Sequence, residues 1–324
     1  MAFLALGCGA GSHASDRRAL PPAAEPGISP PLAVAPAGRV QRLASSPEGV
    51  AVDPGSGRVA VGLRNPDQLA ILAGSSGRLL RRLRLPESPR HLQLADRSGV
   101  VLVPAERADE LIRVSLRSER ILSRTRVGTF PHGVIQSGDR IFVADELGGR
   151  ISVIRAGRLT ATLTGLTQPG GLTVADGRLA VVDVRTRRLV VFDARSLRRV
   201  ADVPAGVGST HAVADLSGQV VVADTEGRAL LIYRLSPRVR LERRIPLAGT
   251  PYGIAVDPVN RRVWITLTSA NRVLGYDLST GAPRRIASFP TVRQPNTVAV
   301  DPTGGRVFVV SRTENQLQTI RLKR

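Results

Sequence analysis

Two histidines, His132 and His211, stand at matching places in a pattern that recurs along this chain of 324 residues. Each follows the residue that opens a recurring run, Pro131 in "PHGVIQSGDRIFV" and Thr210 in "THAVADLSGQVVV". A neutral imidazole can take a proton from a substrate, and a divalent cation can stabilise the anion that forms. Catalysis through these two side chains is therefore one hypothesis that the sequence raises.

The position after the opening residue varies in type from run to run and is mostly polar or aromatic. Read along the chain, it is Glu48, Arg90, His132, Gly170, His211, Tyr252 and Asn296. A purely structural position would more often repeat one residue type. We therefore predict that these side chains, Gly170 excepted, form a ligand-binding ring, in which Gly170 leaves room between the two histidines. His91 lies one position further on in the second run.

The runs themselves predict the fold. They open at Pro47, Pro89, Pro131, Pro169, Thr210, Pro251 and Pro295, so their spacings are 42, 42, 38, 41, 41 and 44 residues. Seven units of about 41 residues with alternating apolar positions predict an all-β, seven-bladed β-propeller with four-stranded antiparallel blades. In the sixth unit, alternation and turn residues predict strands at 252–256, 262–266, 272–276 and 284–287. The loop into the first strand of a blade borders the central channel, which would place the ring at a channel mouth.

The seventh unit lacks a fourth strand, because the sequence stops after "NQLQTIRL". The segment "GRVQRLAS" at 38–45 resembles the outer strands of other units, such as "GRLLRRLRL" at 77–85. We therefore expect the N-terminal strand to complete the last blade and close the ring, which removes exposed sheet edges.

The runs "GVAVDP", "GIAVDP…RRVWI" and "NTVAVDP…GRVFVV" resemble YVTN-repeat propellers, and "RIFVADELGGRISVI" at 140–154 is NHL-like. The resemblance covers 38–324 and implies a bacterial propeller. It does not imply one activity, since propeller families include enzymes, binders and scaffolds.

A weaker resemblance connects "PHG" at 131–133 and "TH" at 210–211 with the streptogramin B lyases, which are seven-bladed propellers with a histidine base and a magnesium ion. Those enzymes have an acidic residue two positions before a catalytic histidine, where this chain has Phe130 and Ser209. Lactonase-like propellers need a Glu, an Asn and an Asp that converge. Glu48 and Asn296 are on adjacent blades, but no partner Asp is evident.

Three hypotheses for the ring stay open at this point: a solvated channel mouth, a small-molecule or glycan site, and an enzyme. The sequence identifies no metal ligands with confidence and implies no cofactor beyond a possible divalent cation. Two sets of aspartates are better explained by structure. Asp53, Asp257 and Asp301 precede turns, and Asp145, Asp183 and Asp224 follow second strands, where a carboxylate can fix a loop.

The charge of the chain limits its partners. The formal net charge is +20, and Lys323 is the one lysine among 46 basic residues. Two explanations of the excess of arginine stay open. One is a codon bias toward arginine, and the other is a surface that binds anionic partners. Aromatic residues make up 3% of the chain and no nucleic-acid-binding motif occurs, so nucleic acid is an unlikely partner.

The first eight residues, "MAFLALGC", resemble the end of a bacterial lipoprotein signal peptide, with Cys8 as the lipidation site. The usual charged segment is missing, which allows the true start to lie upstream. Residues 9–37 are rich in Ala, Pro and Gly, a composition typical of a flexible linker. We therefore predict a signal peptide at 1–8, a linker at 9–37 and the propeller at 38–324.

Together these observations predict a monomeric, extracytoplasmic protein that a lipid anchors to the bacterial cell membrane. The function they favour is non-catalytic binding, at the channel mouth, of a small molecule, a glycan or an envelope protein, with anionic partners favoured. The alternative is a metal-assisted lyase or lactonase-like hydrolase with His132 and His211 in its active site.

Overall fold

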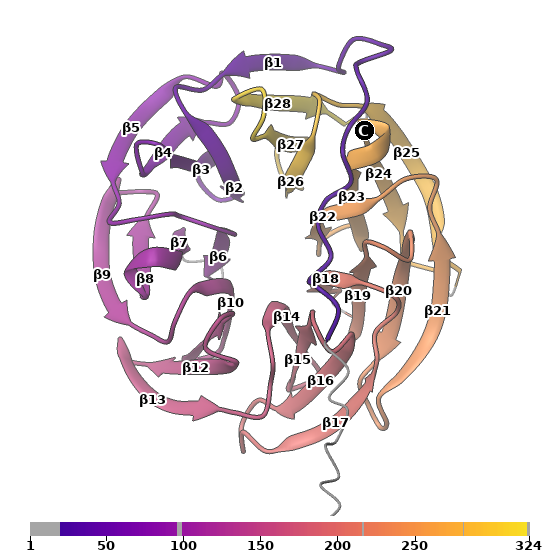
Figure 1. The fold of residues 1–324 in the computed structure, drawn as a ribbon. Coiled ribbons are helices and arrows are strands. Elements are labelled where there is room, and N and C mark those ends of the chain that lie inside the picture. Colours follow the sequence, from indigo (N-terminus) through magenta and orange to yellow (C-terminus); the bar gives the residue numbers. More distant parts are fainter. Residues whose placement is uncertain (1–19, 96–98, 216, 281, 323–324) are drawn as a thin grey trace, which may run out of the picture.

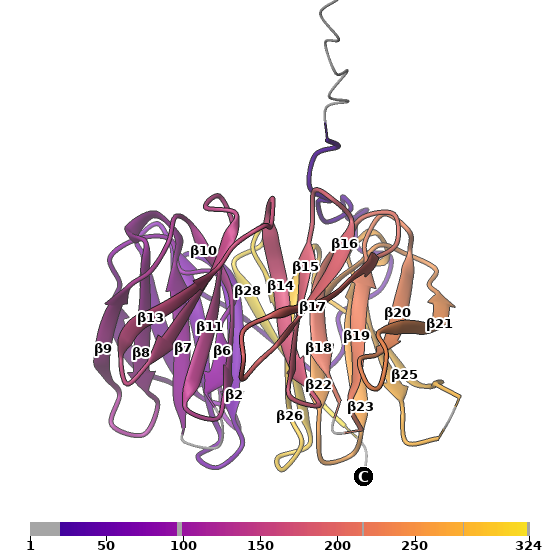
Figure 2. The same cartoon turned by 90° about the horizontal axis from the view of Figure 1, so that it is seen from below.

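Seven four-stranded antiparallel sheets stand around a central axis in the computed structural model, which describes residues 20–95, 99–215, 217–280 and 282–322 (Figure 1). Seen from the side, the sheets form a disc (Figure 2). The all-β, seven-bladed propeller predicted from the repeat is therefore confirmed. Cys8, the predicted signal peptide and the first part of the predicted linker lie outside the described residues.

Each blade runs outward from the axis in chain order. Blade 1 contains β2 (Ser46–Asp53), β3 (Arg58–Arg64), β4 (Gln68–Ala73) and β5 (Leu79–Arg84). Blade 2 contains β6 (Gln93–Ala95), β7 (Val100–Ala105), β8 (Glu110–Ser115) and β9 (Arg120–Arg126), with the short 3-10 helix η1 (Glu106–Ala108) after β7. Blade 3 contains β10 (Pro131–Ser137), β11 (Arg140–Asp145), β12 (Arg150–Arg155) and β13 (Arg158–Leu163).

The remaining blades repeat this order. Blade 4 contains β14 (Pro169–Ala175), β15 (Arg178–Asp183), β16 (Arg188–Asp193) and β17 (Arg199–Pro204). Blade 5 contains β18 (Ser209–Ala214), β19 (Gln219–Asp224), β20 (Ala229–Arg234) and β21 (Arg240–Pro246). Blade 6 contains β22 (Pro251–Asp257), β23 (Arg262–Leu267), the 3-10 helix η2 (Thr268–Ala270), β24 (Arg272–Asp277) and β25 (Arg284–Pro290). Its four strands lie where the alternation of the sixth unit predicted them.

Blade 7 is shared between the two ends of the propeller. It contains β26 (Pro295–Asp301), β27 (Arg306–Ser311) and β28 (Gln316–Arg321), and its outer strand is β1 (Arg39–Arg42). β1 pairs antiparallel with β28, from Arg39 opposite Thr319 to Arg42 opposite Gln316. The predicted closure of the ring by the N-terminal strand is therefore confirmed.

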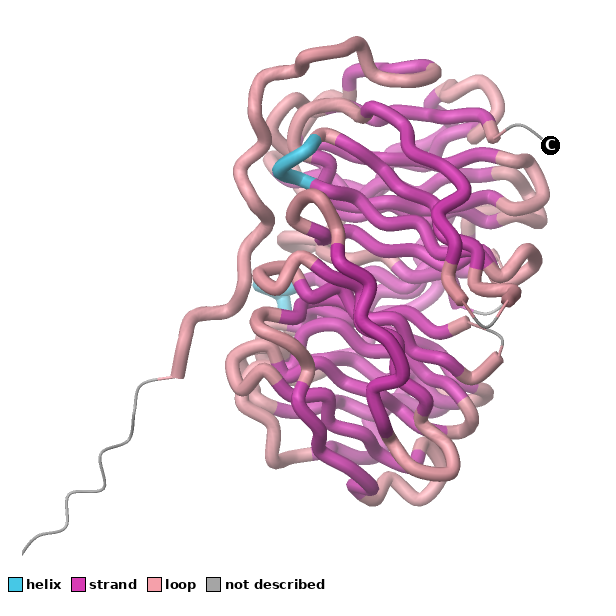
Figure 3. The backbone as a smooth tube through the Cα atoms, turned by 90° about the vertical axis from the view of Figure 1, so that its right-hand side faces the viewer, coloured by secondary structure: helices cyan, strands magenta, loops and turns pink. Residues whose placement is uncertain are grey.

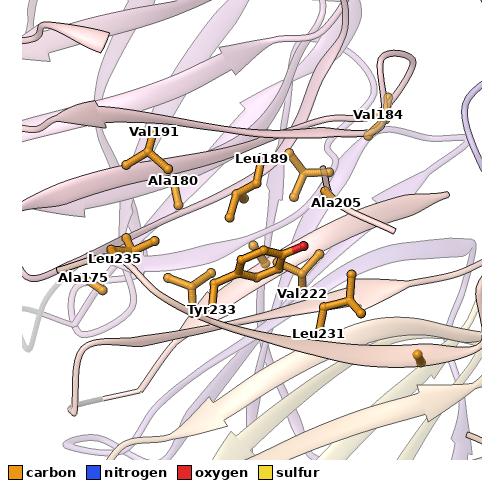
Figure 4. Packing of buried hydrophobic residues seen from close by; sticks show 14 residues of the cluster. Ala175, Ala180, Val184, Leu189, Val191, Ala205, Val222, Leu231, Tyr233 and Leu235 are labelled. Carbon is orange, nitrogen blue, oxygen red and sulfur yellow. The ribbon is translucent and has the colours of Figure 1, made fainter. Parts of the chain in front are cut away.

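The hydrophobic core lies between neighbouring blades and consists of seven clusters, one at each blade interface. Between blades 4 and 5, Ala180 and Leu189 belong to the same buried cluster as Val222 and Tyr233 (Figure 4). The hydroxyl of Tyr233 reaches the surface of this cluster and donates a hydrogen bond to the Pro204 carbonyl at 2.8 Å. Small and β-branched side chains fill these interfaces because the sheets stack closely.

Residues 20–37 lie along one face of the disc, and we call this segment the strap (Figure 3). The strap is held mostly through its backbone. Gln294 donates a hydrogen bond to the Gly27 carbonyl at 3.0 Å, and Asn271 donates one to the Pro30 carbonyl at 2.9 Å. Ser29 is 2% exposed. The described part of the predicted linker therefore packs on the propeller, on the face where the innermost strands begin. We call this the mouth face.

Among the described residues, no helix has the length and apolar character needed to span a membrane.

Gln318 should be essential for closure, because its fully buried side chain bonds to three backbone groups in two other segments. It accepts a hydrogen bond from the Val292 amide at 3.0 Å and donates to the carbonyls of Ala37 at 2.7 Å and Pro290 at 3.0 Å. Gln318→Leu keeps the approximate volume and removes all three of these hydrogen bonds, of which the one to the Val292 amide is buried. We expect the free energy of unfolding to fall by about 2 kcal/mol or more.

Urea denaturation measures this change, with the half-buried Gln68→Leu in β4 as the matched control. Equal stability of the two variants would contradict the role given to Gln318.

Candidate functional site

The predicted ring residues lie at the mouth face, each at or before the start of an innermost strand. Glu48, His132 and Tyr252 are buried, at 3%, 7% and 6% exposure, and Arg90, His211 and Asn296 are half-buried. In every blade except blade 2, the ladder between the first two strands shifts its register at this position. Such bulges turn a side chain away from the regular alternation.

The structure adds a second set of mouth residues that the sequence analysis did not identify. They lie at the end of the second strand or directly after it in four blades: Arg64, Glu106, Glu146 and Arg312. The signal was present in the sequence, because these positions are also equivalent in the repeat and carry charged side chains. Three of the four belong to blades whose second strand does not end in an aspartate.

Charged residues of the two sets form one network of ion pairs over blades 7, 1 and 2. Glu106 contacts Arg64 at 2.6 Å and Arg90 at 3.3 Å. Glu48 contacts Arg312 at 3.0 Å, Arg90 at 3.5 Å and Arg64 at 3.7 Å. The side chains of both glutamates are less than 5% exposed, and each buried carboxylate is balanced by guanidinium groups that are themselves only partly exposed.

His132 connects this network to blade 3. Its Nδ1 lies 2.9 Å from Glu146 and 3.3 Å from Glu106. Gln168 donates a further hydrogen bond to Glu146 at 2.8 Å. Burial alone would lower the pKa of His132, but the two carboxylates outweigh it and raise that pKa. Burial would raise the pKa of Glu146, and contact with His132 instead lowers it to about 2.

Three histidines meet beside this network. His91 Nε2 lies 3.0 Å from His211 Nε2, and the ring centroids of His91 and His132 are 4.8 Å apart. Tyr252 packs edge-on against His211 at a centroid distance of 4.7 Å. The structure thus brings together the two predicted histidines, 6.5 Å apart at their centroids, through His91, which the sequence analysis had placed just outside the ring.

The environment of His91 and His211 favours neutral imidazoles. Burial, followed by the nearby His211 and His132, lowers the pKa of His91 well below its usual value. Burial, followed by His132 and Arg90, lowers the pKa of His211 to about 3. Burial also raises the pKa of Tyr252 to about 12, so its hydroxyl stays protonated.

His91 reaches the other histidines because of its place in the repeat. The equivalent position is glycine in blades 1, 3, 4 and 6 and Thr297 in blade 7. In blade 5 it is His211, because Ser209 pairs with Asp224 there as Pro131 pairs with Asp145 in blade 3. These residues and His91 line the channel, which encloses a cavity of about 90 Å³. At Gly133, a Cβ atom would lie 2.4 Å from the Gly170 carbonyl oxygen of the next blade, so glycine there permits close approach. In blade 2 the innermost strand begins only at Gln93, which leaves space for an imidazole.

A larger cavity of about 620 Å³ lies between the strap and blades 1 and 7. Its lining residues are Pro26, Ile28, Ser46, Arg293, Gln294, Asn296, Arg312, Thr313 and Asn315. The Asn296 Oδ1 atom is buried and has no hydrogen-bond partner among the described residues. Of the predicted ring, only Asn296 borders this cavity.

Two carboxylate sets noted in the sequence have structural partners. Asp53 and Asp257 accept hydrogen bonds from the amides of the turns that follow them. Asp183 accepts from the amides of Thr167 and Gln168, and Asp224 accepts from three backbone amides, those of Val207, Gly208 and Gly227. These aspartates fix loops, as predicted.

Two groups within the described part of the chain have the donor atoms for a metal ion. One is His91, His132 and His211, and the other is Glu106, His132 and Glu146; within each, the donor atoms lie within 4.8 Å of one another. Glu48, considered for a lactonase-like site, is instead surrounded by three arginines.

The fold and this site define a seven-bladed β-propeller protein whose channel mouth carries buried arginine–glutamate pairs and a histidine cluster. No family model matches the chain, and no curated protein matches its sequence.

Solved structures do match. A chain of Kuenenia stuttgartiensis hydrazine synthase is 16% identical with a TM-score of 0.74, over 87% of this chain and 97% of that one. A chain of the mitotic checkpoint complex is 13% identical with a TM-score of 0.76, over 100% and 99%. The Myceliophteria thermophila Cps50 (Swd1) β-propeller domain is 10% identical with a TM-score of 0.72, over 88% and 100%. At these identities the likeness shows the fold alone.

The ion-pair network should contribute measurably to the free energy of unfolding. Glu106→Ala leaves the half-buried guanidinium groups of Arg64 and Arg90 with the longer contacts to Glu48 as their ion pairs, so we expect the free energy of unfolding to fall by about 3 kcal/mol. Chemical denaturation measures it. The control is Glu226→Ala. The Glu226 side chain is 40% exposed and pairs with Arg187, so this change should lower the free energy of unfolding by less than about 1 kcal/mol. Comparable losses in both variants would contradict this account of the network.

Proposed function

We propose that this protein is a non-catalytic binding protein that takes a small anionic molecule at its channel mouth. The observation that carries the proposal is the 620 Å³ cavity between the strap and blades 1 and 7. Its volume falls within the range of small-molecule sites, and seven of its nine lining residues are polar or charged.

The charges around the cavity favour an anion. Arg312 contacts Glu48 through Nε, and Arg293 contacts Glu314 at 3.7 Å. Each guanidinium carries five N–H donors, so these contacts leave donors for a carboxylate or phosphate. The arginine side chains are 51% and 45% exposed, which makes them accessible to a ligand. The buried Oδ1 of Asn296 supplies an acceptor that a ligand hydroxyl would satisfy.

The fold agrees with a binding role. Propellers generally mediate binding, and one similar structure is part of the mitotic checkpoint complex. The YVTN-like and NHL-like repeats, together with the lipobox-like end of the first eight residues, support a bacterial protein that is anchored outside the cytoplasm. An envelope glycan or protein that carries acidic groups is then the natural source of the ligand.

A metal-assisted hydrolase or lyase is the second candidate. The contact of His132 with both Glu106 and Glu146 favours it, because a histidine held by carboxylates is a competent general base. Turnover of the bound molecule would distinguish this candidate from simple binding.

Calorimetric titration with inorganic phosphate, citrate and glucuronic acid tests the binding proposal, with EDTA present to remove metal ions. We expect at least one of these probes to bind, and Arg312→Ala and Arg293→Ala each to weaken its binding at least 10-fold, because each removes a charged donor from the cavity. Arg81→Ala, which removes an exposed arginine of the outer strand β5, is the matched control and should leave the affinity unchanged. Failure of all three probes, or equal affinity in all variants, would overturn the proposal.

The anchoring proposal has a separate test. In a bacterial host, the full chain should partition with the membrane fraction and Cys8→Ser should partition with the soluble fraction, because the thiol carries the lipid. Fractionation with immunoblotting measures this. A Cys8→Ser variant that stays with the membrane would show that lipidation of Cys8 is not the anchor.

A further inference from the structure

We propose that His91, His132 and His211 form a binding site for one transition-metal ion, Zn²⁺ or Cu²⁺, at the inner end of the channel mouth. This site is distinct from the anion cavity of the proposed function. The metal-binding proposal and the anion-binding proposal can therefore be tested independently of each other. Imidazole nitrogens favour these ions over Mg²⁺ and Ca²⁺, which prefer oxygen.

The spacing of the nitrogen atoms fits a shared ion. Two nitrogens that each lie 2.0–2.1 Å from a tetrahedral zinc ion are about 3.3 Å apart. His91 Nε2 and His211 Nε2 are 3.0 Å apart, and the donor atoms of the three side chains all lie within 4.8 Å of one another. A movement of about 1.5 Å by one imidazole would complete the set. A hydrogen bond between His91 and His211 would explain the short distance between those two side chains, but it would not explain why the donor atom of His132 also lies nearby.

The outer nitrogens of two rings already have the partners that metal-binding histidines use. His132 Nδ1 faces Glu106 and Glu146, and His211 Nδ1 lies 2.9 Å from Thr210 Oγ1. Thr210 in turn contacts Thr225 at 2.8 Å. Such contacts fix the tautomer and the ring orientation of a ligand, so that the other nitrogen can face the ion.

The channel supplies room for the ion and one or two waters. The three histidines border the 90 Å³ cavity, whose remaining walls include Val50, Val134 and other apolar side chains. One water occupies about 30 Å³ of liquid volume. The geometry therefore gives three protein ligands and an open position for water or a ligand group.

The alternative group of Glu106, His132 and Glu146 is less suited to a cation. Glu106 is already paired with the guanidinium groups of Arg64 and Arg90, at 2.6 and 3.3 Å. An ion placed against this carboxylate would meet both positive charges. Among the ion pairs of the described residues, none joins His91, His132 or His211 to a guanidinium group.

The test uses the metal-free full chain, purified without a histidine tag. Calorimetric titration with ZnCl₂ should show one equivalent of tight binding, and MgCl₂ should bind at least about 100-fold more weakly. Each of His91→Gly, His132→Ala and His211→Ala should weaken Zn²⁺ binding at least about 100-fold. His13→Ala, which removes the fourth histidine of the sequence, outside the described residues, is the matched control and should bind as the unmodified chain does.

His91→Gly is the decisive variant, because glycine is the residue of four other blades at this position and the fold should accept it. Circular dichroism and thermal melting of the metal-free variants establish that they are folded. In the Cu²⁺-loaded protein, electron paramagnetic resonance should show coupling to imidazole nitrogens that His91→Gly reduces.

Three results would overturn the proposal: no Zn²⁺ binding, unchanged Zn²⁺ binding in folded His91→Gly, or equal affinity for Mg²⁺. Because the anion titrations are carried out in EDTA, failure of metal binding leaves their result intact.

Discussion

The pairing of β1 with β28 is the interaction on which the rest of this structure depends. Every other blade is built from consecutive strands, but blade 7 takes its outer strand from the start of the propeller. Gln318 strengthens the joint, because its side chain bonds both to Ala37, just before β1, and to the segment at Pro290 and Val292 that leads into blade 7. Without this pairing the ring would have two free edges, and the interface clusters between blades 6, 7 and 1 would lose a neighbour.

The mouth depends on the closed ring in turn. Its ion-pair network begins at Arg312 in blade 7, passes through Glu48 and the arginines of blades 1 and 2, and ends at His132 in blade 3. Blades 7 and 1 are neighbours only because the ring is closed. Burying so many charges is tolerable because each carboxylate meets several guanidinium groups in fixed geometry. The same rigid surroundings hold the three histidines at short range, and preorganised groups of this kind bind a ligand at low entropic cost.

Much of this architecture could be predicted from the sequence. The period-two alternation and the turn residues of the repeat gave the strands, and the missing fourth strand of the last unit gave the closure. Five of the six side chains of the predicted ring followed from equivalent places in the repeat, whereas the strand register puts His211 one residue further along, at the position equivalent to His91. His91 and Glu106 were not assigned to the site from the sequence. The isolated bridge between Pro89 and Ala105 brings His91 and Glu106 to the mouth, and the space for His91 arises from glycines in other blades. The strap has no periodicity, and its position depends on a few side chains, among them Gln294 and Asn271, that bond to its backbone.

The order in which the chain is synthesised gives the closure one more consequence. β1 leaves the ribosome first and β28 follows nearly three hundred residues later, so blade 7 cannot assemble during most of translation. The strap is continuous with β1, and it forms one wall of the large cavity. That cavity therefore forms only after the ring has closed. A molecule that binds in it would stabilise the closed ring against opening.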